Sequence, residues 1–348
     1  MKALPAHWYR DPATLALERE RIFDRGWHLL AHASRLRKPG DHVVADCAGL
    51  PVLAVRGTDA DGAPGPIRAF HNVCRHRAGP LALCDGLAAR SLRCRYHGWT
   101  YALDGVLRSA PEMGTAPDFK PSDIVLPQLA VRVWQGLVFA AVDETNAPGF
   151  EAFVAGIDAR LGANRGLAQY GHHHRTGYDV ACNWKVYVDN YLEGYHVPHI
   201  HPGLNSLLDY RQYVTECGDW FSYQYSPLES DPALYGDGDA LYYFIYPNTM
   251  LNLLPGRLQS NRVLPLGPER CIVEFDYYYL DDDSDEAAAR RQADHDFAHQ
   301  VQDEDIEICE HVQRGLASGS YVPGRLNPLR ENAVFHYHEL LRAAYRAG

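Results

Sequence analysis

The sequence has no apolar run approaching the roughly 18 to 20 residues that a membrane-spanning helix needs. It is also poor in positive charge, because 33 Lys and Arg face 44 Asp and Glu, giving a formal net charge of −11 without a long basic run. This balance argues against nucleic acid and anionic membranes as partners. The first residues, Met1 to Trp8, lack the apolar core of a secretion signal, so we expect a cytoplasmic protein.

Two further absences narrow the chemistry. No G-x-G-x-x-G loop follows a strand-like run, so the chain is not expected to bind a nicotinamide dinucleotide itself. The eight cysteines do not resemble a disulfide framework, because no secretion signal accompanies them. Only Cys74 and Cys94 have histidines at a ligand spacing, and we expect the other six to be small buried side chains.

The first part of the chain predicts a helical start and then an all-β module. Asp11-Pro12 precedes apolar residues up to Trp27, which predicts a capped amphipathic helix. Short strand-like runs separated by Gly, Pro and Asp turns follow, for example over residues 42–45, 51–55 and 131–142.

The later part of the chain mixes helices with long strands. Residues 272–279 alternate with period two, and a turn over residues 266–270 joins them to residues 262–265 in a hairpin. A further strand is predicted over residues 241–246. A long helix is predicted from Ser284 to Leu316, with Ser284 as its N-cap and acidic residues in its first turn.

These elements predict an α+β fold with an all-β domain inserted near its start. Residues 1–39 are expected to form a helical segment that packs on the last domain, residues 40–142 the all-β domain, and residues 150–348 the α+β domain. Residues 143–149 are rich in turn-forming types and predict the linker between the last two.

Two short loops of the all-β domain each offer one cysteine and one histidine. Cys74 and His76 are followed, after residues 77–93, by Cys94 and His97. An ordinary zinc finger instead places its two cysteines together and its two histidines together. The interleaved order suits a Rieske [2Fe–2S] cluster, in which one iron takes two cysteines and the other takes two histidines. A structural zinc site is the alternative.

A second group of ligand-type residues lies in the α+β domain. Asp189, Glu193 and His196 are spaced i, i+4 and i+7, so on a helix they share one face. Pro198 is expected to end or kink that helix, which frees His201 to turn back beside His196. Two histidines and one carboxylate form the iron site of non-haem Fe(II) oxygenases.

The carboxylate of such a site can come from far away in the sequence. Asp305 falls inside the apolar stripe of the predicted long helix, and a carboxylate directed at a core is costly unless a cation meets it. Glu304 lies at the edge of the stripe and Asp303 points elsewhere, so Asp305 is the preferred ligand. The stripe consists of Phe297, Val301, Ile308, Val312 and Leu316.

The first motif, with the flanking residues 97–101 and 104–105, resembles the Rieske domains of ring-hydroxylating oxygenase α subunits. Residues 242–248, 263–268 and 301–316 extend the resemblance, and they look like choline monooxygenase and related quaternary-ammonium oxygenases. The resemblance implies a helix-grip catalytic domain, a curved antiparallel sheet around a long helix. It also implies a homotrimer in which the cluster of one subunit serves the iron of the next.

The resemblance also implies roles for individual residues. Spacing alone leaves His199 as a possible partner of His196, whereas the family pattern favours His196 and His201, with Asp305, as ligands of a mononuclear Fe(II). Asn190 and Glu193 then fall among the catalytic residues.

Glu193 matches the acid that joins the cluster to the iron. Ring dioxygenases usually carry Asp there, and the segment from Asn190 to His196 is one residue shorter than in the plant choline enzymes.

The implied activity is a dioxygen-dependent hydroxylation or N-demethylation of a small quaternary ammonium compound of the choline, betaine or carnitine type. Electrons would come from NAD(P)H through a separate flavin and iron–sulfur reductase. Aromatic faces for a methylated cation are expected among Tyr242, Tyr243, Phe244 and Tyr246, although aromatic residues also occur in sheet cores without a ligand.

Two other functions remain open at this point. An aromatic-ring dioxygenase α subunit would carry the same motifs, but such subunits are commonly longer than 348 residues. A Rieske electron carrier without oxygenase activity would have no use for the second site.

Overall fold

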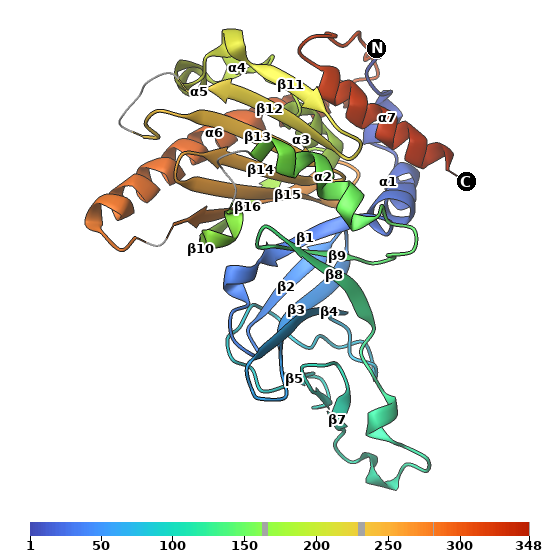
Figure 1. Ribbon diagram of the computed structural model, residues 1–348. Coiled ribbons are helices and arrows are strands. Elements are labelled where there is room, and N and C mark those ends of the chain that lie inside the picture. Colours follow the sequence, from blue (N-terminus) through green and yellow to red (C-terminus); the bar gives the residue numbers. More distant parts are fainter. Residues whose placement is uncertain (162–165, 229–233, 281, 348) are drawn as a thin grey trace. The chain divides into compact units, whose positions relative to one another are not determined.

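The computed structural model describes residues 1–161, 166–228, 234–280 and 282–347. The chain divides into two compact units. The host unit comprises Met1–Ile22, Gly149–Arg165 and Tyr170–Gly348, and the inserted unit comprises Phe23–Pro148 with Gly166–Gln169. The predicted α+β fold with an all-β insert near its start is therefore confirmed (Figure 1).

The inserted unit is built from two antiparallel sheets. Six strands form the larger sheet in the order β1-β9-β8-β4-β3-β2, and three short strands form the smaller one, β5-β6-β7. Every second side chain of β2 is buried, which is the pattern of a strand with one face on a core. The strands are β1 (Trp27–His32), β2 (His42–Cys47), β3 (Leu50–Thr58), β4 (Pro64–His71), β5 (Leu92–Arg93), β6 (Thr100–Tyr101), β7 (Leu107–Ser109), β8 (Gln128–Trp134) and β9 (Leu137–Ala141).

The single strand predicted over residues 131–142 is wrong, because β8 and β9 form a hairpin there. The turn residues Gln135 and Gly136 have φ values of 51° and 81°. Two successive residues with positive φ are what a tight two-residue hairpin turn requires.

The predicted N-terminal helix is shorter than expected. Helix α1 (Pro12–Glu18) begins as predicted, with the Asp11 side chain accepting a hydrogen bond from the Ala13 amide. Trp27 instead begins β1, whose six residues are all buried and which pairs with β9. Because β1 completes the larger sheet, the inserted unit starts at Phe23 rather than at residue 40.

The host unit contains a seven-stranded antiparallel sheet in the order β10-β16-β15-β14-β13-β12-β11. The predicted hairpin is present as the pair β15–β16, and the predicted strand over residues 241–246 is present as β13. The strands are β10 (Gly171–Val180), β11 (Val214–Cys217), β12 (Phe221–Pro227), β13 (Asp239–Ile245), β14 (Thr249–Leu254), β15 (Arg257–Gly267) and β16 (Arg270–Tyr279).

The long helix α6 (Asp285–Ala317) passes behind this sheet in the view of Figure 1. It begins where the sequence predicts, since the Ser284 side chain accepts a hydrogen bond from the Ala287 amide. No helix in the described ranges is long and apolar enough to cross a membrane. The other helices of the host unit are α2 (Phe150–Leu161), α3 (Trp184–Tyr191), α4 (Val197–Ile200), α5 (Pro202–Leu207) and α7 (Asn332–Arg346).

The buried face of α6 is not the predicted apolar stripe. Val312 is 45% exposed, whereas the polar Gln302 and Gln313 are buried. Their burial is tolerated because Gln302 Oε1 accepts from the Tyr187 hydroxyl and Gln313 Oε1 accepts from the Asn183 amide. The buried side chains are Ala287, Asp294, Ala298, Gln302, Cys309, Gln313 and Leu316.

The expectation that six cysteines are buried holds for four of them. Cys84 and Cys217 are exposed, so neither serves as a small core residue. The buried four are Cys47, Cys182, Cys271 and Cys309.

A fully buried ion pair ties α1 and α3 together. Lys185 Nζ lies 2.6 Å from Glu18 Oε1, and both side chains are 0% exposed. The Trp184 indole donates to the same carboxylate at 2.8 Å, and the Tyr345 hydroxyl of α7 donates to it as well. Three separate segments of the chain are thus held by one carboxylate.

Replacing Lys185 by methionine is expected to lower the free energy of unfolding by about 3–5 kcal/mol, because the Glu18 carboxylate would remain buried without its cation. Urea denaturation of the host unit measures this loss. The exposed pair Arg10–Glu269 provides the control, and Arg10→Ala is expected to change stability by less than about 1 kcal/mol. Unfolding of the Lys185 variant at the parent's urea concentration would contradict the assignment.

Candidate metal centres and active site

The two loops of the inserted unit that carry the first motif have the same backbone pattern. The Cys74 amide donates to the Gly79 carbonyl, and the Cys94 amide donates to the Trp99 carbonyl five residues further on. The first cysteine carbonyl also accepts from Ala78, as the second does from the residue four positions after it. The two loops are therefore structural copies of each other, which is what a two-sided metal group requires.

The four ligand-type side chains of these loops face one another. Cys74 and Cys94 are buried, and the rings of His76 and His97 lie 4.5 Å apart. A Cβ added to Gly79 would lie 2.9 Å from Cys94 Sγ, so only glycine permits this approach of the loops.

The donor set fits a binuclear cluster better than a single ion. In the described ranges, the one group of three or more ligand atoms lying within 4.8 Å of one another is His196, His201 and Asp305 in the host unit. The two thiols and two imidazoles of the inserted unit thus do not surround one point. Two irons, one held by cysteines and one by histidines, need such a spread arrangement.

Tyr101 gives the cysteine side of this centre an additional hydrogen bond. Its hydroxyl accepts from the Arg75 amide at 3.1 Å and lies 3.2 Å from Cys74 Sγ. Because the amide supplies one hydrogen, the tyrosine's own hydrogen is available to the sulfur. Hydrogen bonds to sulfur are among the features that set the potential of an iron–sulfur cluster.

The single helix predicted through Glu193 and His196 is wrong. Helix α3 ends at Tyr191, and Glu193 lies in the following loop, where its carboxylate accepts from the amides of Tyr195 and His196. Gly194 is required in this loop because a Cβ there would lie 2.6 Å from the Tyr213 ring. The chain therefore turns before Pro198 is reached.

Pro198 lies in the first turn of the short helix α4, a position at which the missing N–H costs little. His196 and His201 flank this helix as its N-cap and C-cap. One helical turn, and not a kink, brings the two imidazoles to a ring distance of 5.0 Å.

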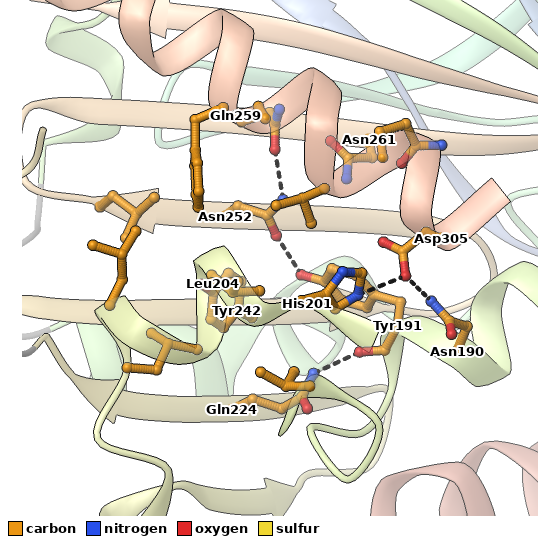
Figure 2. A pocket seen from close by; sticks show the side chains of 18 of the residues that line it. Asn190, Tyr191, His201, Leu204, Gln224, Tyr242, Asn252, Gln259, Asn261 and Asp305 are labelled. Carbon is orange, nitrogen blue, oxygen red and sulfur yellow. Dashed lines mark hydrogen bonds and ion pairs between the residues drawn. The ribbon is translucent and has the colours of Figure 1, made fainter. Parts of the chain in front are cut away.

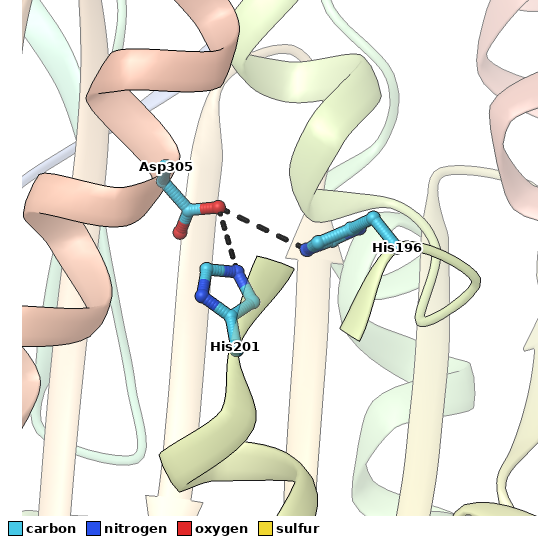
Figure 3. Close-up of side chains that lie close together, drawn as sticks. All are labelled: His196, His201 and Asp305. Carbon is cyan, nitrogen blue, oxygen red and sulfur yellow. Dashed lines mark hydrogen bonds and ion pairs between the residues drawn. The ribbon is translucent and has the colours of Figure 1, made fainter. Parts of the chain in front are cut away.

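The side chains of His196, His201 and Asp305 converge on one point (Figure 3). Asp305 Oδ1 lies 3.0 Å from His201 Nε2 and 3.8 Å from His196 Nε2. Burial lowers the pKa of His201, but the hydrogen bonds to Asp305 and Glu304 outweigh this effect and raise the pKa overall.

Each imidazole is oriented by a second carboxylate. His196 Nδ1 lies 2.7 Å from Glu193 Oε1, and His201 Nδ1 lies 2.7 Å from Glu304 Oε2. Both rings therefore direct Nε2 toward Asp305, as in carboxylate–histidine–metal arrangements. Sequence reasoning placed Glu304 at the edge of a stripe and gave it no role, because no spacing rule links it to His201.

Asn190 and Asp189 are neighbours in α3 with different partners. Asn190 Nδ2 donates to Asp305 Oδ1 at 2.6 Å, so it fixes the carboxylate that faces the two imidazoles. Asp189 accepts from the Tyr9 hydroxyl at 2.6 Å and lies 2.9 Å from His338 Nε2. His199 is exposed and is not among the side chains that line the cavity described next.

A cavity of the host unit extends from the three converging side chains (Figure 2). It lies between the seven-stranded sheet, α6 and the segment 187–213. Of the four aromatic residues expected to line it, only Tyr242 does so; Tyr243 packs on Tyr223, and Phe244 packs on Tyr337. The aromatic lining is Tyr187, Tyr191, Tyr213, Tyr235, Tyr242, Phe275 and Phe297.

Comparison with known proteins assigns both units. Residues 26–125 match the family model "Rieske [2Fe-2S] domain", and residues 167–347 match "Ring hydroxylating alpha subunit (catalytic domain)". The chain therefore belongs to the family of Rieske oxygenase α subunits with a ring-hydroxylating-type catalytic domain, and its fold is the helix-grip arrangement with an inserted Rieske domain.

Among its relatives is a chloroplastic choline monooxygenase of Arabidopsis thaliana, 37% identical over 97% of this chain and 81% of the relative. The carnitine monooxygenase oxygenase subunit of Escherichia coli K12 is 29% identical over 99% of this chain and 94% of the relative.

Solved structures give the same assignment. A quaternary ammonium Rieske monooxygenase aligns with a TM-score of 0.90 and 27% identity, over 99% of this chain and 96% of the other. A Rhodococcus naphthalene 1,2-dioxygenase aligns with a TM-score of 0.81 over 99% of this chain and 95% of the other, but at 19% identity this likeness shows the fold alone.

Proposed function

We propose that this chain is the oxygenase component of a system that uses dioxygen to hydroxylate or N-demethylate a small quaternary ammonium compound. The observation that supports this most is the cavity of the host unit, in which seven aromatic side chains surround the space next to His196, His201 and Asp305. Aromatic faces attract methylated cations, and a carboxylate with two imidazoles is the donor set of non-haem iron oxygenases.

The site roles that we propose follow the donor sets. Cys74, His76, Cys94 and His97 hold a [2Fe–2S] cluster in the inserted unit, in the domain expected over residues 40–142. In the domain expected over residues 150–348, a mononuclear Fe(II) is held by His196, His201 and Asp305. When bound, these groups supply electron transfer and dioxygen activation respectively.

The remaining site residues act on the ligands. Glu193 and Glu304 hold the two imidazoles by Nδ1 and leave Nε2 free for metal binding. Asn190 holds Asp305 by Oδ1. Glu193 also serves as the acid through which the cluster of a neighbouring subunit is coupled to His196.

The partners that we propose are a separate flavin and iron–sulfur reductase that delivers electrons from NAD(P)H, and two further copies of the chain in a homotrimer. We propose the cytoplasm as the location. The relation to a quaternary ammonium monooxygenase described for inter-subunit electron transfer supports an assembly of several subunits.

The substrate class is tested by oxygen consumption with a reductase and NADH, using choline, glycine betaine, carnitine and simple aromatic acids. At least one quaternary ammonium compound is expected to give oxygen uptake matched by product, at about tenfold or more the rate with the aromatic acids. Coupled turnover with the aromatic acids alone would reject the proposal and favour a ring dioxygenase.

A further inference from the structure

The cavity is lined by amides as well as aromatic rings, and several of these amides are already engaged. Gln224 donates to the Tyr191 carbonyl and accepts from the Tyr213 hydroxyl. Asn252 accepts from the Tyr191 hydroxyl and donates to Gln259 Oε1, a chain visible in Figure 2. These amides are fixed by the protein itself and have nothing left to offer a ligand.

Two other amides differ. Asn261 Oδ1 and Gln302 Nε2 are buried, yet neither atom has a hydrogen-bond partner among the residues that the structure describes. Asn261 is 2% exposed and Gln302 is 1% exposed, and both line the cavity. Buried polar atoms in native proteins are normally paired, so two unpaired atoms in a cavity wall indicate a polar ligand group.

The two amides lie at the metal end of the cavity. Gln302 precedes Asp305 by one turn of α6, and its Oε1 is held by the Tyr187 hydroxyl at 2.6 Å, which leaves Nε2 unpaired. Figure 2 shows Asn261 of β15 beside α6, on the side where Asp305 lies. Together the pair offers one donor and one acceptor, which is the complement of a hydroxyl group.

The charge of the cavity favours an uncharged group there. Arg257 is the one lysine or arginine lining the cavity within the described ranges. Its Nη1 donates to Asp294 Oδ1 at 2.5 Å, and its Nη2 donates to Gln259 at 3.0 Å. The hydroxyls of Tyr235 and Tyr279 also donate to Asp294, each at 2.5 Å, so the ion pair is held rigidly.

A substrate carboxylate would therefore enter a cavity whose single cation is already neutralised. It would also lie in the same cavity as Glu193 and Asp305, whose negative charges oppose it. The remaining Nε–H of Arg257 is a single donor and cannot form the paired contact by which arginine normally binds a carboxylate.

We propose that Asn261 and Gln302 bind the hydroxyl group of a quaternary ammonium alcohol, and that this pair selects such alcohols over zwitterionic betaines. This inference rests on the proposed substrate class and adds to it the uncharged end of the molecule. The aromatic lining takes the methylated ammonium, and the amide pair takes the hydroxyl.

The test compares three ligands by calorimetry on the iron-loaded protein under anaerobic conditions, so that no turnover occurs. Choline carries the hydroxyl, ethyltrimethylammonium has nearly the same shape without it, and glycine betaine carries a carboxylate. Choline is expected to bind about tenfold or more tightly than either of the other two, because a site built for a hydroxyl is left unpaired by its analogue.

The variant Asn261→Leu is expected to bring the affinity ratio of choline to ethyltrimethylammonium close to one, while ethyltrimethylammonium binds as well as before. Gln292→Leu, an exposed change on the same helix as Gln302, is the control and should retain the parent's ratio. A loss of affinity for both ligands in equal proportion would indicate a structural role and overturn the inference.

Each remaining outcome is informative. Equal binding of choline and ethyltrimethylammonium to the parent protein would overturn the amide pair and leave the quaternary ammonium class intact. Tightest binding of glycine betaine would overturn it in favour of Arg257. If none of the three ligands binds, the proposed substrate class fails. The ligand series on the parent protein decides the matter even if Asn261→Leu does not fold.

Discussion

Replacing Asp305 by alanine is expected to lower the iron content from about three to about two atoms per chain, while the visible absorption of the cluster persists. Product formation should fall by more than about a hundredfold, because even the loss of an outer partner of a metal ligand costs about 10–100-fold. The reason is geometric, since Asp305 Oδ1 is the oxygen toward which both His196 Nε2 and His201 Nε2 are directed.

Asp303→Ala is the matched control for this change. It removes a carboxylate from the same helix, but that side chain is 64% exposed and its nearest basic partner is His299 at 3.9 Å. This variant should keep all its iron. An Asp305 variant with unchanged iron would mean that another acid completes the site, and Glu304, 2.7 Å from His201, would be the first to examine.

Glu193→Gln is expected to abolish detectable product formation while the cluster remains intact. The amide can no longer carry a charge between the cluster and His196, and its NH2 group has to face either His196 Nδ1 or the amides of Tyr195 and His196. The direct measurement is the rate at which a chemically reduced cluster is reoxidised with substrate and dioxygen present. That rate should fall by about a hundredfold or more.

Excess ferrous salt is included in this measurement, so that a weaker iron site does not imitate a block in electron transfer. Glu193→Asp should recover part of the reoxidation rate, because it restores the charge at a shorter reach. Glu307→Gln, an exposed change on α6, serves as the neutral comparison. Normal reoxidation in the Glu193 variant would remove the coupling role and leave Glu193 as a partner of His196 alone.

The sequence was most informative where function requires residues close together in the chain. The Cys74/His76 and Cys94/His97 loops could be predicted, because each loop is a local turn with its own ligands. Asp305 could be predicted in spite of a wrong stripe, since the argument depended only on a carboxylate near the buried face of α6. The stripe itself was misplaced because buried Gln302 and Gln313 are satisfied by partners from α3 and the residue preceding it.

The parts that could not be predicted depend on contacts between distant segments. Glu304 and His201 are separated by 103 positions, and no local rule connects them. The aromatic lining was sought along one strand, whereas the fold draws it from three helices, several strands and loops. The course of the chain after Tyr191 was wrong because the Glu193 side chain competes for backbone amides, an effect that helical periodicity does not include.

The division of the chain into a continuous insert and a discontinuous host has a consequence for biosynthesis. The insert is almost wholly contained in residues 23–148, so it can fold while the ribosome is still extending the chain. The host has to wait, because Glu18 near its beginning is bound by Tyr345 close to its end. Until that tyrosine emerges, the first helix has no completed surface on which to settle, and the nascent protein resembles a finished redox module attached to an unfinished enzyme.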